Sequence, residues 1–551
     1  MHDDLIARAR TWLAEDPDPD TREELARLLD ADDVTELTAR FSGTLQFGTA
    51  GLRGELGAGP MRMNRAVVIR AAAGLAAYLN AKGHHNGLVV IGYDARHKSA
   101  DFAQDTAAVL TGAGLRAAVL PRPLPTPVLA FAIRHLGAVA GVEVTASHNP
   151  PRDNGYKVYL GDGSQIVPPA DAEIAAEIAA IRTLNDVPRP GTGWDTLDDS
   201  ALDAYLARTD AVLAPGSPRT ARTVYTAMHG VGKDVLLAAF ARAGFPAPAL
   251  VTEQAEPDPD FPTVAFPNPE EPGAMDLSFA RARETNPDLI IANDPDADRL
   301  AVAVKDDGDG DGDGDGDWRM LRGDEVGALL ATHLVHRGAH GTFAESIVSS
   351  SLLGRIAEKA GLPYEETLTG FKWIARVEGL RYGYEEALGY CVDPDGVRDK
   401  DGITAALLIT ELASTLKEKG RTLLDLLDDI AVEHGLHATD QLSVRVEDLS
   451  LITDAMRRLR EQPPAQLAGL TVTRAEDLTE GTATLPPTDG LRYTLDGARV
   501  IVRPSGTEPK LKCYLEVVVP VAAHADLPAA HAKATDLLST IKRDLSTAAG
   551  I

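Results

Sequence analysis

The chain has 551 residues, more than one hydrophobic core usually supports, and about 150 residues per domain predicts three or four domains. Its 54 Lys and Arg stand against 82 Asp and Glu, and the net charge of −28 argues against nucleic acid or an anionic membrane as partner. No stretch approaches the ~20 apolar residues that span a bilayer, and the acidic start has no apolar signal core behind it. With only two cysteines, Cys391 and Cys513, we expect a cytoplasmic protein without a disulfide framework.

The first forty residues predict an added layer of helices. Leu5, Ala9 and Leu13 mark one amphipathic face. Thr21, with Glu24 three residues later, predicts a capping box that opens a second helix. We expect this part of the chain to be structural.

A glycine-rich loop with one arginine follows at residues 47–54, Phe-Gly-Thr-Ala-Gly-Leu-Arg-Gly. Glycines let backbone N–H groups approach an anion and Arg53 adds a two-pronged donor, although the same composition suits an ordinary loop. A predicted helix from Asn64 to Lys82 and a strand from Gly87 to Gly92 then begin an alternation that runs to residue 144. This alternation is typical of an α/β layer fold.

The apolar run from Gly137 to Val144 ends in Thr-Ala-Ser-His-Asn-Pro at residues 145–150. This predicts a buried strand that presents Ser147 in a tight loop, where open α/β sheets bind their ligands. The hydroxyl is a candidate nucleophile or phosphate carrier, or else it bonds its own backbone in a turn. Lys157 lies shortly after this turn, where it is either a solvated surface residue or a group that stabilises charge or moves a proton.

A second region begins after the proline- and glycine-bearing stretch 188–193. We predict a helix at 201–212 and a fresh strand at 223–228, and we place the first domain boundary at residue 205. The glycines of 229–233, His-Gly-Val-Gly-Lys, lie at a strand-to-helix junction and indicate tight packing of that turn.

Three aspartates alternate in Asn293-Asp294-Pro295-Asp296-Ala297-Asp298-Arg299, directly after the strand-like residues 289–292. Carboxylates this close repel one another unless a cation lies among them, and oxygen ligands suit Mg²⁺. An EF-hand loop fails, because its sixth position would be Arg299 and its twelfth Lys305. A solvated acidic turn is the remaining alternative. The Gly-Asp repeats that end at Asp317 also fail the EF-hand pattern, and we expect an exposed hairpin insertion there.

The last two regions carry further polar loops. The third contains Thr369-Gly370-Phe371-Lys372 and the pair Glu385-Glu386, which suits sugar hydroxyls or a charged surface. In the fourth, a strand from Val500 delivers Arg503 to a loop with Ser505, Gly506 and Thr507. Bidentate Arg, hydroxyl donors and a backbone donor suit a phosphate dianion, with a plain proline turn as the alternative.

Together these loops resemble the signatures of the α-D-phosphohexomutase superfamily, specifically phosphoglucomutase/phosphomannomutase, and they occur in the family's order. Residues 47–54 and 369–372 resemble its longer phosphoglucomutase branch. The resemblance implies three related α/β domains and a distinct C-terminal α+β domain around a central cleft. We expect these domains at 1–205, 206–320, 321–438 and 439–551, carrying in turn the phosphoserine, metal-binding, sugar-binding and phosphate-binding loops.

The resemblance also implies roles for individual residues. Ser147 would be the phosphoserine carrier, and it would bind Mg²⁺ together with Asp294, Asp296 and Asp298. The other catalytic residues implied are Lys157, Arg299 and Lys372. The substrate-binding residues implied are Arg53, His148, Thr369, Gly370, Glu385, Glu386, Arg503, Ser505, Gly506 and Thr507.

The activity that the resemblance implies is interconversion of hexose 1-phosphate and hexose 6-phosphate, with glucose or mannose as the sugar and glucose 1,6-bisphosphate as intermediate and activator. We expect a monomer or homodimer whose partner is a small sugar phosphate. Ala387 stands where many members have Ser, which keeps a phosphopentomutase-type member open. A non-catalytic protein that binds metal or sugar phosphate is the alternative from another class, and a metal-dependent phosphatase is disfavoured because the sequence shows no multi-histidine cluster.

Overall fold

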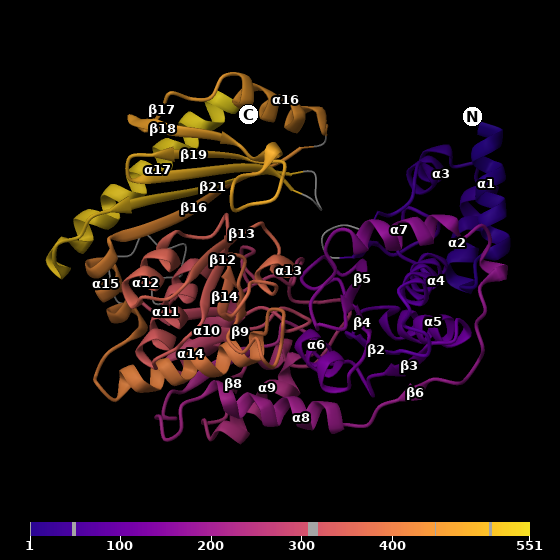
Figure 1. Cartoon of the computed structure of the whole chain (residues 1–551), viewed down its shortest axis with the longest axis horizontal. Helices are drawn as coiled ribbons and strands as arrows, with labels where there is room; N and C mark the ends of the chain where they lie inside the picture. Colours follow the sequence, from indigo (N-terminus) through magenta and orange to yellow (C-terminus); the bar gives the residue numbers. More distant parts are fainter. Residues whose placement is uncertain (1, 47–50, 307–317, 447, 506–509) are drawn as a thin grey trace. The chain divides into compact units, whose positions relative to one another are not determined.

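The computed structural model describes residues 2–46, 51–306, 318–446, 448–505 and 510–551 (Figure 1). The chain forms two compact units and passes between them more than once. The first unit comprises Met1–Met320 and Gly389–Ser414, and the second comprises Leu321–Leu388 and Thr415–Ile551. Within the described residues, no helix combines the length and apolar character needed to cross a bilayer.

The N-terminal layer consists of α1 (His2–Glu15), α2 (Pro19–Asp30) and α3 (Val34–Phe41). Leu5 and Ala9 are buried among these helices, as their spacing predicts. The predicted capping box is wrong. Helix α2 begins earlier, at Pro19, because proline suits the first helical position and Asp18 caps the helix through the N–H of Asp20. The Thr21 hydroxyl instead donates to Asp16.

The first sheet follows the order β1-β5-β4-β2-β3-β6. Strands β4, β2, β3 and β6 are parallel neighbours, whereas β5 pairs antiparallel with both β4 and β1. The strands are β1 (Leu52–Glu55), β2 (Leu88–Tyr93), β3 (Arg116–Val119), β4 (Ala140–Val144), β5 (Asp153–Leu160) and β6 (Asp195–Thr196). Its helices are α4 (Arg65–Ala81), α5 (Ser99–Gly112), α6 (Thr126–His135) and α7 (Ala170–Ala180).

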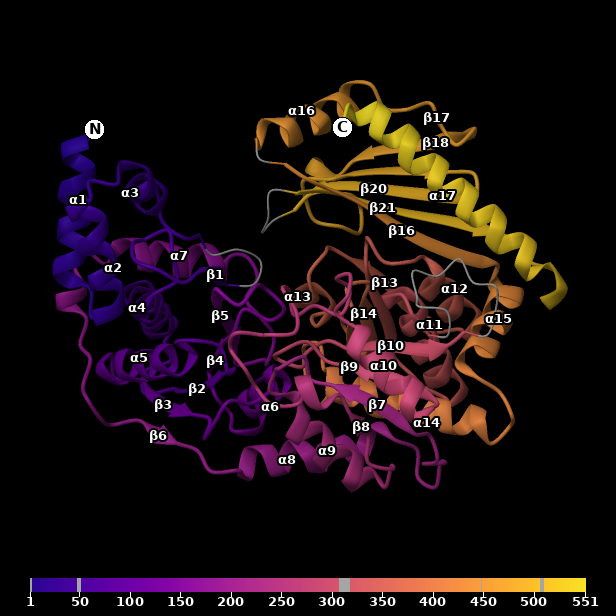
Figure 2. The ribbon, with the colours of Figure 1, turned by 180° about the vertical axis from the view of Figure 1, so that it is seen from behind.

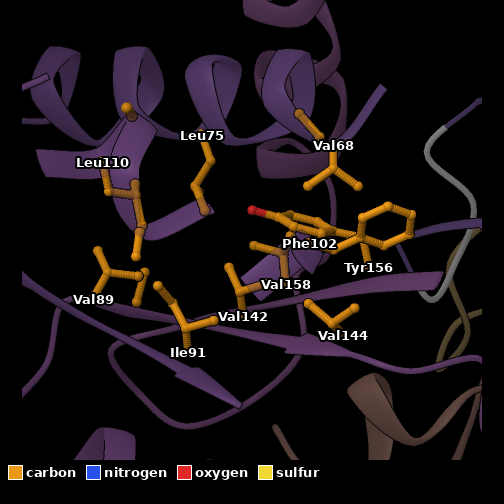
Figure 3. Close-up of a cluster of buried hydrophobic side chains, with 14 of the residues drawn as sticks. Val68, Leu75, Val89, Ile91, Phe102, Leu110, Val142, Val144, Tyr156 and Val158 are labelled. Atoms are coloured by element: carbon orange, nitrogen blue, oxygen red, sulfur yellow. The ribbon is translucent and has the colours of Figure 1, made fainter. Parts of the chain in front are cut away.

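Both faces of this sheet are covered. Alternate residues of β2 and β4 face α4 and α5, as Figure 3 shows for Val89, Ile91 and Val142. On the other face a Cβ at Gly141 would meet Ile133 of α6 at 2.3 Å, so α6 packs closely there. Burial on both faces explains why the strands read as continuous apolar runs in the sequence.

The second sheet, β11-β10-β9-β7-β8, lies in the same unit. Strands β8, β7 and β9 are parallel, and β9, β10 and β11 are antiparallel neighbours. Its strands are β7 (Thr223–Thr226), β8 (Ala249–Leu250), β9 (Leu289–Ala292), β10 (Ala301–Lys305) and β11 (Trp318–Met320), with helices α8 (Ser200–Thr209), α9 (Gly232–Ala243) and α10 (Asp276–Thr285). The Gly-Asp repeats connect the paired strands β10 and β11, and residues 307–317 lie outside the described residues. The unit also contains β15 (Gly389–Cys391) and most of α14 (Gly402–Lys417).

In the second unit, three parallel strands follow the order β13-β12-β14. They are β12 (Thr342–Ser346), β13 (Tyr364–Thr367) and β14 (Leu380–Glu385), with helices α11 (Gly323–His336), α12 (Leu352–Ala360), α13 (Phe371–Ile374) and α15 (Leu423–His434). Each of the three related sheets therefore has a parallel core, as the alternation in the sequence predicts.

The C-terminal sheet differs because its neighbouring strands, ordered β16-β21-β20-β19-β18-β17, are all antiparallel. They are β16 (Leu436–Arg445), β17 (Gln466–Leu467), β18 (Leu470–Asp477), β19 (Leu491–Leu495), β20 (Ala498–Pro504) and β21 (Lys510–Val519). Helix α17 (Leu527–Ala549) lies along this sheet, and α16 (Ser450–Glu461) packs against α17 (Figure 2). This separate α+β layer agrees with the fold class predicted for the end of the chain.

The glycine turn after β7 packs tightly, as its composition indicates. A Cβ at Gly230 would lie 2.3 Å from both Cα and O of Pro295 in the aspartate loop. We expect Gly230→Ala to lower the melting temperature by several degrees, because neither backbone can give way without moving the aspartates. Gly191→Ala, which adds a Cβ into open space, is the control and should leave the melting temperature unchanged. Equal melting temperatures for both variants would contradict this packing argument.

Candidate active site

Ser147 lies in the loop after β4 and is 3% exposed. Its φ of 51° is in the left-handed region, which a serine rarely adopts. The Ser147 N–H donates to Oγ1 of Thr145 at 2.8 Å, and its own Oγ donates to Oδ2 of Asp294 at 2.7 Å. The hydroxyl therefore points at the aspartate loop that follows β9.

Arg96 fixes the backbone of the Ser147 loop. Its Nη2 donates to the carbonyls of Ser147 and Asn149 at 2.7 and 2.6 Å, and its Nη1 donates to that of Pro150 at 2.8 Å. Because β2 and β4 are parallel neighbours, the residues that follow them meet at one edge of the sheet. Sequence reasoning missed this role, although an Asp-x-Arg pattern directly after β2 was its signal.

The three alternating aspartates are fully buried, and one oxygen of each lies within 4.8 Å of the others. Oδ1 of Asp296 and Oδ1 of Asp298 have no hydrogen-bond partner among the described residues. Buried carboxylate oxygens without donors are costly, unless a cation binds them. An all-oxygen cluster with two such oxygens therefore fits a hard divalent cation, which makes a solvated acidic turn untenable.

Three cationic side chains lie close to this cluster, two of which are Lys157 and Arg299. Nζ of Lys157 donates to Oδ2 of Asp296 at 2.7 Å and to Oδ2 of Asp298 at 3.0 Å. Nε of Arg299 lies 3.9 Å from both Oδ2 of Asp294 and Oδ1 of Asp298. Burial alone would lower the pKa of Lys157, but the two carboxylates outweigh it and raise that pKa. Lys157 is therefore an ammonium that neutralises charge in this arrangement.

Lys400 belongs to the same cluster, and sequence reasoning missed it. Its Nζ lies 3.3 Å from Oδ2 of Asp298. Burial and the Asp296 carboxylate raise the pKa of Asp298, but Lys157, Lys400 and Arg299 outweigh both and lower it. A Cβ at Gly402 would lie 2.2 Å from the Arg299 carbonyl, so this segment packs directly on the aspartate loop. No local pattern links positions so far apart in the sequence.

Two more predicted residues lie beside Ser147. Nδ1 of His148 is 3.2 Å from Oγ of Ser147 and 3.8 Å from Oδ2 of Asp294. Burial, together with the charges of Arg299 and Arg53, holds the pKa of His148 well below its usual range, so its ring is neutral near pH 7. Nη1 of Arg53 donates to Oδ1 of Asn149 at 3.0 Å. The structure thus brings together all eight site residues predicted in the first unit.

The second unit holds the remaining predicted residues. Glu386 accepts hydrogen bonds from the hydroxyls of Ser346 and Ser349, and Glu385 ends β14. Burial first and the Glu386 carboxylate next raise the pKa of Tyr514, which Arg503 opposes. Tyr514 therefore lies near both the paired glutamates and the arginine. Thr369, Gly370 and Lys372 lie at the start of α13, Ser505 follows β20, and Gly506 and Thr507 lie outside the described residues.

The fold and the site define an α/β protein that presents a serine hydroxyl to a buried cluster of three carboxylates. Family models match the chain in order: phosphoglucomutase/phosphomannomutase alpha/beta/alpha domain I at residues 44–185, domain II at 203–312, domain III at 322–433 and the C-terminal domain at 442–534. The chain belongs to the phosphoglucomutase/phosphomannomutase family. This confirms the predicted family and four-domain architecture. The predicted boundaries stay predictions, and α8 spans the one at residue 205.

Curated relatives cover nearly the whole chain. A probable phosphomannomutase of Haemophilus influenzae is 51% identical over 83% of this chain and 93% of its own length. The human phosphopentomutase is 35% identical over 92% and 90%, and a phosphoglucomutase of Staphylococcus haemolyticus is 35% identical over 90% and 94%. A solved putative phosphomannomutase of Thermus thermophilus is 26% identical with a TM-score of 0.71, covering 92% of this chain and 99% of that one. The relatives' names thus include both hexose and pentose substrates.

Glu143 is an unpredicted feature of the site. It lies on β4 directly opposite Lys157 of β5 and is fully buried, and neither carboxylate oxygen has a hydrogen-bond partner among the described residues. Burial first, and then the carboxylates of Asp296 and Asp94, raise its pKa well above the usual range.

The raised pKa makes a testable prediction about stability. The native state keeps a proton on Glu143 that the unfolded chain releases above about pH 4.3, so this carboxyl costs stability progressively as the pH rises from there toward its native pKa. Glutamine has the same shape and does not titrate. We expect the melting temperature of Glu143→Gln in EDTA, relative to the unsubstituted protein, to increase between about pH 5 and about pH 8. The exposed Glu23→Gln is the control, and a pH-independent difference for Glu143→Gln would contradict the argument.

Proposed function

We propose that the protein is a phosphosugar mutase that interconverts hexose 1-phosphate and hexose 6-phosphate, with Ser147 as the phosphate carrier. The observation that carries the proposal is the 2.7 Å hydrogen bond from Ser147 Oγ to Asp294, within a buried aspartate cluster that retains two unpartnered oxygens. Membership of the mutase family supports it. Glucose and mannose are the sugars proposed first, and the names of two relatives support them.

Phosphoryl transfer requires the protein mainly to position the groups and to neutralise charge. In the first step the Oγ–P bond of phosphorylated Ser147 breaks, a bond from phosphorus to the free sugar hydroxyl forms, and the hydroxyl proton passes to a base. The sugar bisphosphate then turns over and returns its other phosphoryl group to Ser147. His148 is a candidate for the proton transfer, because its neutral ring lies 3.2 Å from Oγ.

Asp294, Asp296, Asp298 and the phosphate on Ser147 would hold Mg²⁺. The ion would supply positive charge to the oxygens of the transferred phosphoryl group. Lys157 and Lys400 provide fixed positive charge behind the aspartates, and they do not depend on the bound sugar.

Most of the remaining residues proposed to bind the substrate belong to the second unit. Arg503, Ser505, Gly506 and Thr507 would bind the phosphate that is not transferred. Glu385 and Glu386 would accept hydrogen bonds from sugar hydroxyls, which a substrate that binds in two orientations presents in similar positions. Arg53, Thr369, Gly370 and Lys372 would contact the sugar phosphate. Cytoplasmic location and a monomer or homodimer stay predictions.

Interconversion of pentose 1-phosphate and pentose 5-phosphate is the second candidate function. The human phosphopentomutase, 35% identical over 92% of this chain, favours it. Ala387, which stands where many members of the family have Ser, keeps it open. Rates on glucose 1-phosphate, mannose 1-phosphate and ribose 1-phosphate, each with its bisphosphate activator and Mg²⁺, distinguish the two. A kcat/KM for ribose 1-phosphate above that for both hexose phosphates would replace the hexose proposal by the pentose one.

The serine carrier is tested by Ser147→Ala in a glucose 1-phosphate to glucose 6-phosphate assay. Removing a covalent carrier should lower kcat by at least about 10³-fold. Ser200→Ala, on the exposed start of α8, is the control and should retain full activity. Intact mass should also show a phosphoryl group on the unsubstituted protein that is lost when hexose 1-phosphate is added. Activity of Ser147→Ala near that of the control would remove Ser147 as the carrier. An unsubstituted protein that shows neither mutase activity nor loss of a phosphoryl group would instead be a non-catalytic binding protein.

The metal proposal is tested by calorimetry. Asp298→Asn removes one carboxylate charge from the cluster, and we expect the Mg²⁺ affinity to fall at least about tenfold. Asp203→Asn, an exposed change in α8, should leave the affinity unchanged. EDTA should abolish activity and added Mg²⁺ should restore it. Equal Mg²⁺ affinity in the two variants would contradict the assignment of the triad.

A further inference from the structure

Besides its carbonyl acceptors, the guanidinium of Arg96 contacts a carboxylate and an aromatic ring. The Arg96 side chain is 1% exposed, and its Nε lies 3.4 Å from Oδ2 of Asp94. Its Cζ lies 4.8 Å from the centroid of the Phe261 ring. An aromatic face attracts a cation, and the attraction grows when water is excluded. The cation that holds the Ser147 loop is thus itself held by a ring from the segment between β8 and α10.

Phe261 has an unusual backbone for so bulky a residue. Its φ of 46° is in the left-handed region, and its side chain is 3% exposed. Such strain persists where the surroundings impose it. Here the Phe261 N–H donates to the Asp258 carbonyl, and the ring meets His229 edge-on at 6.4 Å. His229 is fixed in turn, because its Nε2 lies 2.8 Å from Oγ1 of Thr263.

The neighbouring residue makes a parallel contact. Oδ1 of Asp260 lies 2.8 Å from Nε2 of His97. Two consecutive residues of this segment therefore contact two consecutive residues after β2, Arg96 and His97. The same second-domain sequence also carries Asp294, which accepts the hydrogen bond from Ser147 Oγ. Two contacts therefore fix the Ser147 loop relative to the aspartates: Asp294 accepts from Ser147 Oγ, and Phe261 packs on Arg96, which holds the loop carbonyls.

We propose that Phe261 is a positioning residue for the reaction: its ring fixes the plane of the Arg96 guanidinium and so sets the carbonyls that orient Ser147. The proposal rests on the proposed function of Ser147 as phosphate carrier. The ring blocks water from one face of the guanidinium, so the N–H groups in its plane are directed to the loop carbonyls. A leucine would fill much of the volume but would present no π face to the cation.

The chain offers a matched control in Phe245. Arg219 lies over its ring at 5.0 Å, and the ring is 6% exposed. Arg219 also donates to several backbone carbonyls, including those of Ala214 and Ala243. The pair Arg219–Phe245 thus reproduces the chemistry of Arg96–Phe261 at the start of the second sheet. Phe245→Leu measures what the loss of such a contact costs the fold alone.

The experiment compares Phe261→Leu, Phe261→Tyr and Phe245→Leu with the unsubstituted full chain. We expect Phe261→Leu to lower kcat for glucose 1-phosphate about tenfold with KM changed less than twofold, because the loop moves relative to the aspartates while sugar contacts stay. Phe261→Tyr retains the aromatic face and should restore most of kcat. Phe245→Leu should lower the melting temperature without changing kcat. Equal kcat for the two leucine variants, or no rescue by tyrosine, would overturn the proposal.

A double-mutant cycle tests whether Phe261 acts through Arg96. In an Arg96→Lys background, Phe261→Leu should have no further effect on kcat, whereas additive losses would show that it acts elsewhere. Hydrogen exchange of residues 145–153 provides a readout independent of activity. It should accelerate at least about tenfold in Phe261→Leu and stay unchanged in Phe245→Leu. Unchanged exchange in both overturns the positioning role even in an active mutase, whereas faster exchange in a protein without mutase activity would refute only the proposed function.

Discussion

The structure depends on balanced charge around three carboxylates that are fully withdrawn from water. Asp294, Asp296 and Asp298 would repel one another at this separation, and burial removes the solvent that would screen them. Lys157 and Lys400, which lie far apart in the sequence, compensate for part of this charge. Two oxygens remain without hydrogen-bond partners among the described residues, so the chemistry of the cluster fits one more cation. The buried cluster is therefore incomplete as a structural ion-pair network and suited to a ligand.

The need to balance the charge of the three buried aspartates accounts for several features of the surrounding fold. The aspartate loop has to be approached by backbones that carry no Cβ, and Gly230 and Gly402 meet it from two segments. Lys157 can reach the cluster because β5 runs antiparallel beside β4 and so begins near the Ser147 loop. The first two sheets thus meet at the ends of their strands, where α/β folds place ligands. The chain returns through Gly389–Ser414 to the first unit, which brings Lys400 to the same place.

Local patterns predicted much of this arrangement. The strand 289–292 and the helix 64–82 are found within a residue or so of their predicted ends, because apolar runs and caps are local signals. Ser147, the three aspartates and Lys157 were predicted from motifs that each occupy a few consecutive residues. Arg96, Lys400 and Glu143 were not, because their importance comes from partners on other elements. The prediction of a capping box at Thr21 was wrong although its motif is local, because Asp18, three residues earlier, caps the helix instead.

The same distinction explains why the chemistry is easier to assign than the sugar. Phosphoryl transfer needs a carrier, a cation site and fixed charge, and the residues proposed for all three lie within one compact unit. Discrimination between a hexose and a pentose depends on a few hydroxyl contacts, each worth little on its own unless a buried polar group is left unpaired. Relatives named for a hexose are 51% and 35% identical to this chain, and the human relative named for a pentose is 35% identical. In the proposed site, the choice of sugar therefore rests on the residues around Glu385, Glu386 and Ala387. That choice can change without disturbing the buried cluster that we propose for the transfer.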